Sequence, residues 1–146
     1  MTDDIPMQIS AVPAEFIPQV WEDVRPFIAE SADFTNGRYE EEDAYHLVTQ
    51  MGYVLWIAFN GSGIKGATIT GFINYPRKKA LHVMFLGGGS GWDWKDPLLV
   101  TLRRWATDNH CDCIEASGRQ GWARVFKDDG FTPLWQTFEL PLKTSD

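Results

Sequence analysis

The stretch from residue 98 to residue 142 most constrains the fold, because four segments of different periodicity follow one another there. Apolar residues recur at helical spacing over 98–106, whereas 112–116 is a short run typical of a strand. The pattern predicts a second, short helix within 118–131 and a final strand at 134–140. A helix between two strands predicts a crossover connection, and therefore a parallel strand pair.

The preceding residues predict the rest of the sheet and two further helices. Strands are expected at 7–12, 53–59, 64–75 and 80–86, and helices at 16–27 and 40–51. Pro26 is expected to kink or end the first helix, and the acidic run 40–43 to cap the second. The order β-α-α-β-β-β-α-β-α-β predicts a mixed α/β domain over residues 1–146, with a mainly antiparallel central sheet.

Charge and composition exclude several classes of protein. The formal net charge of −7 disfavours a general nucleic-acid binder, and the one basic run, 77–79, is expected to be a hairpin turn. No apolar run is long enough to span a membrane, and the acidic N-terminus does not resemble a signal peptide. Two reduced cysteines fit a cytoplasmic protein that is not secreted.

Cys111, Cys113 and His110 form the only tight group of metal-ligating residue types. Three ligands so close together on one strand cannot surround a zinc ion tetrahedrally, so no metal is expected. The seven Trp residues allow two interpretations: most lie in the core, or several mark a partner surface. The candidates for contact anchors are Trp92, Trp94, Trp122 and Trp135.

The glycine run 87–91, the helix and strand after it, a second helix and Gly130-Phe131 form a recognisable sequence. In this order the chain resembles the GNAT superfamily of N-acetyltransferases. The phrase at 114–126 is similar to GNAT-like proteins of tailed bacteriophages, some of which are virion components. The resemblance implies a GNAT-like sheet with a splay between two parallel strands.

The resemblance also implies where acetyl-CoA would bind. Its pyrophosphate would lie on backbone N–H groups of a small-residue loop at a helix start. The implied cofactor-binding residues are Leu86, Gly87, Gly88, Gly89, Ser90, Gly91, Arg119 and Phe126. An alternative is that the glycines only allow the chain to reverse over Trp side chains.

Several residues depart from the family's pattern. Asp93 and Lys95 stand where small residues are expected, and Pro97 removes a backbone N–H from the helix start. Arg119 replaces a pantetheine-binding Asn, and Phe126 replaces a Tyr that protonates the leaving thiolate. A phenyl ring cannot act as a general acid.

Three residues are candidates for catalysis. Glu115 or His82 would act as the general base for an amine, and Tyr75 would replace the missing phenol. The alternatives are an ion-pair role for Glu115, with Arg119 or Arg124, and a structural hydrogen bond for His82.

Two functions follow from these residues. The departures favour a degenerate, non-catalytic GNAT-like protein with protein partners, an assembly or virion component in the host cytoplasm or the particle. The alternative is an acyl-CoA-dependent N-acetyltransferase, whose acidic surface would suit a cationic amine acceptor.

Overall fold

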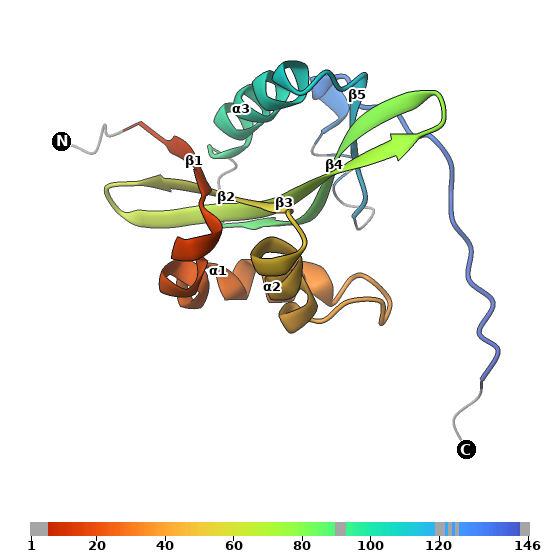
Figure 1. The fold of residues 1–146 in the computed structure, drawn as a ribbon, viewed down its shortest axis with the longest axis horizontal. Helices are drawn as coiled ribbons and strands as arrows, with labels where there is room; N and C mark the ends of the chain where they lie inside the picture. The colour runs from red at the N-terminus through yellow and green to blue at the C-terminus, as the bar shows by residue number, and fades with distance from the viewer. Residues whose placement is uncertain (1–5, 90–92, 119–121, 123, 125, 144–146) are drawn as a thin grey trace.

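A five-stranded sheet with helices on both faces forms the protein, seen in a computed structural model that describes residues 6–89, 93–118, 122, 124 and 126–143 (Figure 1). The strands lie in chain order: β1 (Gln8–Val12), β2 (Val54–Asn60), β3 (Gly63–Tyr75), β4 (Lys78–Gly88) and β5 (Cys113–Ala116). The first four are antiparallel to their neighbours, and β5 runs parallel to β4. The predicted mixed, mainly antiparallel sheet is therefore confirmed.

The helices lie on opposite faces of the sheet (Figure 1). On one face are α1 (Ile17–Ala32), which follows the 3₁₀ turn η1 (Ala14–Phe16), and α2 (Glu41–Gln50). On the other face is α3 (Lys95–Asp108), which supplies the crossover between β4 and β5. A second 3₁₀ turn, η2, spans Lys127–Asp129.

The helix α1 continues through Pro26, so of the two outcomes expected there, a kink or an end, the end is wrong. Proline removes one backbone hydrogen bond, but the apolar stripe of α1 extends past it. Val24 and Ile28 are both fully buried, and Ala32 is nearly so. Burial of this stripe against the sheet sustains the helix beyond the proline.

The start of α2 confirms the capping interpretation of the acidic run. The Glu40 backbone N–H donates to the Asp43 carboxylate at 2.8 Å, and the Glu40 side chain accepts from the Asp43 backbone. This reciprocal arrangement is a capping box, which satisfies two otherwise unpaired donors of the first turn.

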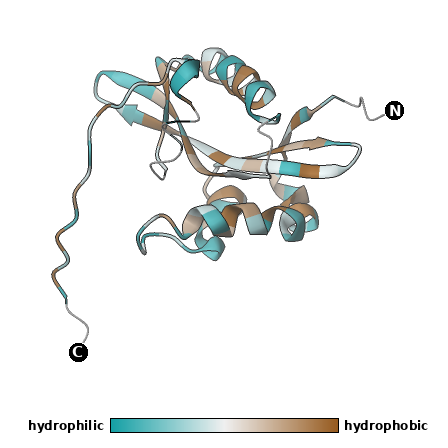
Figure 2. Cartoon of the chain, turned by 180° about the vertical axis from the view of Figure 1, so that it is seen from behind, coloured by the Kyte–Doolittle hydropathy of each residue, from teal (hydrophilic) through white to brown (hydrophobic). Residues whose placement is uncertain are grey.

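Two apolar clusters fill the two sides of the sheet. Side chains of α1 and α2 pack on Leu55, Ile69 and Phe85, and those of α3 pack on Trp56 and Leu81. Apolar residues accordingly lie between the layers, and hydrophilic residues on the outer helix faces (Figure 2). Because successive strand residues face opposite sides, Leu81 and Val83 point toward α3, whereas His82 and Met84 face the α1 side.

The predicted final strand at 134–140 is absent. Residues 131–143 have no regular structure, and from 132 onward every side chain is exposed. Gly130, at φ 93°, turns the chain, which then runs away from β5 along the side of the molecule (Figure 1). A strand requires a neighbour with which to pair, and among the described residues no strand lies beside this segment. Of the short helix expected within 118–131, Trp122 and Arg124 are helical, and residues 119–121, 123 and 125 lie outside the described part.

Candidate functional site

The strands β4 and β5 separate part-way along their length. They pair from Ala80 with Cys113 to Val83 with Ala116, and the Ser117 N–H reaches the Val83 carbonyl at 3.3 Å. Directly after this, β4 contains a bulge, with Ile69 opposite Met84 but Ala67 opposite Gly87. The splay therefore leaves the backbone of β4 after Val83 without a strand partner from β5.

Within the bulge, Phe85 adopts φ 37°, in the left-handed region that non-glycine residues rarely enter. Its ring is buried and packs edge-on against Tyr39 at 5.3 Å between centroids. Tertiary packing thus holds a strained backbone at the point where the strands part. Strain of this kind gathers at binding and catalytic sites.

A cavity of about 580 Å³ opens at the splay, between β4 and the connection from α1 to α2. It is of the size that binds small molecules. Its floor is formed by β4 and the residues after β5, and its rim by the end of α1 and the chain after Gly130. The residues that line the cavity include His82, Leu86, Ser117, Arg38, Thr137 and Glu139.

Three sequence-predicted residues meet beside this cavity. The Glu115 carboxylate oxygen Oε2 accepts hydrogen bonds from His82 Nδ1 and from the Tyr75 hydroxyl, both at 2.7 Å. The side chains of His82 and Glu115 are 15% and 12% exposed, so this contact is largely shielded from water. We call these three residues the His–Glu–Tyr cluster.

The donors and acceptors of the His–Glu–Tyr cluster can be assigned. A carboxylate only accepts hydrogen bonds, so the proton between Glu115 and His82 lies on Nδ1. In the neutral imidazole Nε2 then carries the lone pair, which is the tautomer a general base requires. His82 lines the cavity, whereas Glu115 and Tyr75 are not among its lining residues. Chemically, the arrangement can accept a proton from a group in the cavity and stabilise the resulting imidazolium.

Tyr75 is engaged with Glu115 instead of facing the cavity. The hydrogen bond to Glu115, burial and the neighbouring negative charges of Glu115 and Cys113 together raise the pKa of the Tyr75 phenol. A phenol with a raised pKa is a weaker acid and keeps the proton that it donates to Glu115. The geometry therefore fits a positioning role better than the predicted role in protonating a thiolate.

The glycine run is packed by the protein itself. A Cβ at Gly87 would stand 2.6 Å from the Phe27 carbonyl oxygen, and one at Gly88 2.5 Å from the Trp94 ring. Gly89 donates its N–H to the Lys65 carbonyl at 2.8 Å and accepts from Trp94 Nε1 at 3.1 Å. Gly87 and Gly88 therefore allow close approach of Phe27 and Trp94.

Of the other implied cofactor-binding residues, one lines the cavity and one lies in the core. Leu86 lines the cavity and is 8% exposed. Phe126 is instead buried in an aromatic cluster, stacked on Trp122 at 5.5 Å and tilted against Phe131 at 5.3 Å. Ser90, Gly91 and Arg119 lie outside the described residues.

Of the four predicted contact anchors, Trp94 is a core residue and Trp135 is exposed. Trp94 is 1% exposed, at the start of α3, and packs edge-on against Trp122 at 6.3 Å. Beside it, Lys95 donates to Asp129 at 2.7 Å, and that hydrogen bond raises the lysine's pKa. Trp135 is 70% exposed, and Trp92 is not described. The prediction that Trp94 anchors a partner is wrong, because the glycines beneath it make room for its indole.

Sequence reasoning missed the rim of the cavity. Arg38 pairs with Glu139 at 2.7 Å, which lowers the pKa of that carboxyl, and Asn36 donates to the same residue at 2.9 Å. These residues are about a hundred positions apart in the chain, so no local pattern brings them together.

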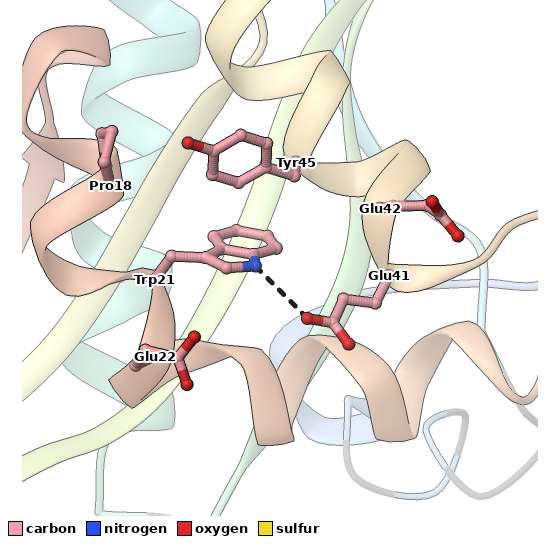
Figure 3. A pocket seen from close by; sticks show the side chains of 6 residues that line it. All are labelled: Pro18, Trp21, Glu22, Glu41, Glu42 and Tyr45. Atoms are coloured by element: carbon pink, nitrogen blue, oxygen red, sulfur yellow. Dashed lines mark hydrogen bonds between the residues drawn. The ribbon is translucent and has the colours of Figure 1, made fainter.

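A smaller pocket of about 310 Å³ lies between α1 and α2 (Figure 3). Trp21 meets Tyr45 edge-on at 5.0 Å and donates to Glu41 at 3.3 Å. Arg25 pairs with Glu22 and Glu41 at 3.1 and 2.7 Å, and these hydrogen bonds raise the pKa of its guanidinium. Two of the three carboxylates around the pocket are thus already paired, as in a helix–helix contact.

Among the described residues, no group of three or more His, Cys, Asp or Glu side chains is placed to hold a metal ion. The helices of the described part include none long and apolar enough to cross a membrane.

Comparison with known proteins finds similar structures but no similar sequence. The chain matches no family model and no curated protein by sequence. Solved structures do match. An aminoglycoside acetyltransferase from an uncultured soil metagenomic sample has a TM-score of 0.72 at 10% identity, covering 95% of this chain and 100% of that one. A predicted acetyltransferase from Clostridium acetobutylicum, solved with acetyl-CoA, has a TM-score of 0.70 at 15% identity, covering 93% and 96%.

A third match is the ribosomal-protein-alanine N-acetyltransferase from Brucella melitensis biovar Abortus, with a TM-score of 0.69 at 13% identity, covering 94% and 99%. The chain has the GNAT fold. At these identities the likeness shows the fold alone, so the fit of acetyl-CoA depends on the residues of this chain.

The residues fit one part of acetyl-CoA and not another. In a GNAT fold the acyl-bearing arm lies in the strand splay, and here β4 after Val83 has no partner from β5 and borders a cavity. The pyrophosphate would need small residues with free N–H groups. Gly87 and Gly88 are instead covered by Phe27 and Trp94, and Pro97 lacks an N–H. The splay therefore fits a thioester arm, whereas Gly87 and Gly88 do not fit phosphates.

Proposed function

We propose that the protein is an acyltransferase that moves an acyl group from a thioester donor, with acetyl-CoA as the first candidate, to an amine. The observation that carries this proposal is the His–Glu–Tyr cluster, which ends in a cavity-lining imidazole at the strand splay. A purely structural histidine would not need a shielded carboxylate, itself held by a phenol, next to a cavity of ligand size.

Each member of the cluster has a distinct part in this proposal. The donor supplies an acyl group activated as a thioester. His82 accepts the proton that the amine loses, through the nitrogen that does not face Glu115. Glu115 fixes the tautomer and stabilises the imidazolium, and Tyr75 fixes the carboxylate. The edge of β4 after Val83, which β5 leaves without a strand partner, would hold the acyl-bearing arm through backbone hydrogen bonds that require no particular side chain.

A cationic amine is the acceptor class that the charge favours. The chain carries a net charge of −7, which attracts cations at long range. Two of the similar structures are an aminoglycoside acetyltransferase and a ribosomal-protein-alanine N-acetyltransferase. Aminoglycosides, polyamines and peptide α-amines therefore form the first acceptor panel.

The experiment has two steps. Acetyl-CoA is titrated into the protein by calorimetry, and free thiol release is then followed with each amine of the panel. Ser117→Trp should block the cavity, since Ser117 is an exposed residue of its lining, and Ser62→Trp, on the exposed β2–β3 turn, is the matched control. Binding that Ser117→Trp abolishes and Ser62→Trp preserves supports the proposal. No binding to the wild-type protein at millimolar acetyl-CoA contradicts it.

A non-catalytic interaction protein is the second candidate, and a specific observation favours it. The glycine run is filled by Phe27 and Trp94, and Phe126, where the family has a tyrosine, is a core residue. In this case the GNAT fold would act through its surface, and the tailed-phage virion or assembly role remains a prediction from the 114–126 phrase. Stoichiometric copies of the protein in purified particles would support that role.

A further inference from the structure

The cavity at the splay carries one negative charge that the described residues do not neutralise. Glu30, an exposed residue in the last turn of α1, lines the cavity, and its carboxylate forms no ion pair or hydrogen bond within the described part of the chain. Two other charged lining residues, Arg38 and Glu139, pair with each other at 2.7 Å. With a neutral imidazole at His82, the lining therefore attracts a cation.

Apolar and aromatic side chains form another part of the lining. They come from the α1–α2 connection, from β4 and from the chain after β5: Phe34, Tyr39, Met84, Phe85, Leu86 and Trp122. Burial against such side chains stabilises aliphatic groups, and aromatic faces also attract cations. The cavity is thus suited to a hydrocarbon chain that carries a positive charge.

Polar side chains on the α1–α2 connection are already engaged with neighbours. Thr35 Oγ1 donates to the Ala32 carbonyl at 2.8 Å and accepts from the Tyr39 N–H at 3.0 Å. Asn36 Nδ2 donates to Glu139 at 2.9 Å. A ligand hydroxyl that loses water on binding needs hydrogen-bond partners in the protein. This part of the lining therefore favours an aliphatic amine over a polyhydroxylated one such as an aminoglycoside.

We infer that the acceptor is a linear diamine with an amine at each end, which rests on the acyltransferase function proposed above. One amine reacts beside His82, and the other, as an ammonium, pairs with the Glu30 carboxylate. The neutral reacting nitrogen forms a C–N bond to the acyl carbon as the C–S bond breaks. Its proton passes to His82 and then to the departing thiolate, which gives an amide and a free thiol. Glu30 determines specificity and takes no part in these steps.

The test compares two amines that differ only at the far end, 1,5-diaminopentane and pentylamine, by thiol release from acetyl-CoA. The diamine should have a KM about fivefold lower, the upper range for an exposed ion pair, at similar kcat. Glu30→Gln should remove this advantage and leave the KM of pentylamine unchanged. Asp33→Asn is the matched control, since it removes an exposed carboxylate at the same helix end but outside the cavity lining. It should keep the advantage.

Calorimetry of 1,5-diaminopentane with the protein alone gives a readout that does not depend on turnover. The wild type should bind the diamine about fivefold more tightly than Glu30→Gln does. Both variants should keep the thermal midpoint of the wild type, because both carboxylates are exposed.

Three results would overturn the diamine inference and leave the acyltransferase intact. They are equal KM values for the two amines in the wild type, equal effects of Glu30→Gln and Asp33→Asn, and a higher kcat/KM for an aminoglycoside than for the diamine. Absence of thiol release with every amine would instead overturn both proposals.

Discussion

Two stretches of β4, only five residues apart, differ in what surrounds them. At His82 the strand faces a cavity, and the imidazole is held by a carboxylate and a phenol. At Gly87 and Gly88 the strand is sealed by Phe27 and Trp94. The first stretch keeps polar groups positioned for proton transfer, and the second uses small residues for packing. In the function proposed above, the first stretch would serve the acceptor side of acyl transfer, whereas Gly87 and Gly88 serve packing.

The largest expected effect comes from the first stretch. With the acceptor found by the panel, His82→Ala should lower kcat/KM by about 10²- to 10⁴-fold, the usual contribution of a general base. Its thermal midpoint should stay close to that of the wild type, because His82 borders a cavity. Glu115→Gln should also lower kcat/KM, since an amide can no longer stabilise an imidazolium. Unchanged kcat/KM in both variants would remove the cluster from the chemistry.

Substitutions that affect the second stretch should lower the free energy of unfolding instead. Trp94→Ala removes a 1% exposed indole that covers Gly88, and should destabilise the fold by about 3–5 kcal/mol. Urea unfolding measures this loss. If the variant were as stable as the wild type but bound acetyl-CoA more weakly, the Trp94 region would belong to the donor site and the contrast would fail.

Gly88→Ala sharpens the same contrast within the glycine run. Its Cβ would overlap the fixed Trp94 ring at 2.5 Å, for an expected destabilisation of about 1–3 kcal/mol. Gly89→Ala is the matched control, because the nearest atom to its Cβ, the Lys65 carbonyl oxygen, lies at 3.8 Å. Denaturant midpoints of the two variants should separate clearly. Equal stability of the two, with donor affinity lost in both, would indicate a phosphate-binding loop.

The smallest effect concerns Tyr75. Its raised pKa means that the folded protein favours the protonated phenol, so its contribution to stability is present below about pH 10 and is lost as the pH rises through the raised value. Absorbance of tyrosinate should show one phenol titrating late, and Tyr75→Phe should remove that component. Activity of this variant should fall less than that of His82→Ala. A titration identical in Tyr75→Phe would mean that the phenol does not contact Glu115 in solution.

The sequence was sufficient for features that depend on local pattern. Apolar periodicity predicted the helices and the strands up to β5, and Glu40 with Asp43 predicted the cap of α2. His82, Glu115 and Tyr75 were each singled out, but their contact required the parallel register that sets His82 beside Glu115.

Features that depend on long-range contacts could not be predicted in this way. The glycine run has the same sequence whether it holds phosphates or makes room for Trp94, so only packing distinguishes the two. Arg38 and Glu139 form an ion pair although about a hundred residues separate them in the chain. The strand predicted at 134–140 is absent, because a local pattern does not supply the neighbouring strand with which the segment would pair.

Comparison of donor fragments tests the central claim most directly. Calorimetry would compare acetyl-CoA with S-acetylpantetheine, which keeps the thioester arm and lacks every phosphate. Because the splay fits the arm and Gly87 and Gly88 do not fit phosphates, the account predicts dissociation constants within about tenfold of each other, a difference below about 1.4 kcal/mol. Acetyl-CoA binding a thousandfold more tightly, with affinity lost in Gly89→Ala, would contradict it.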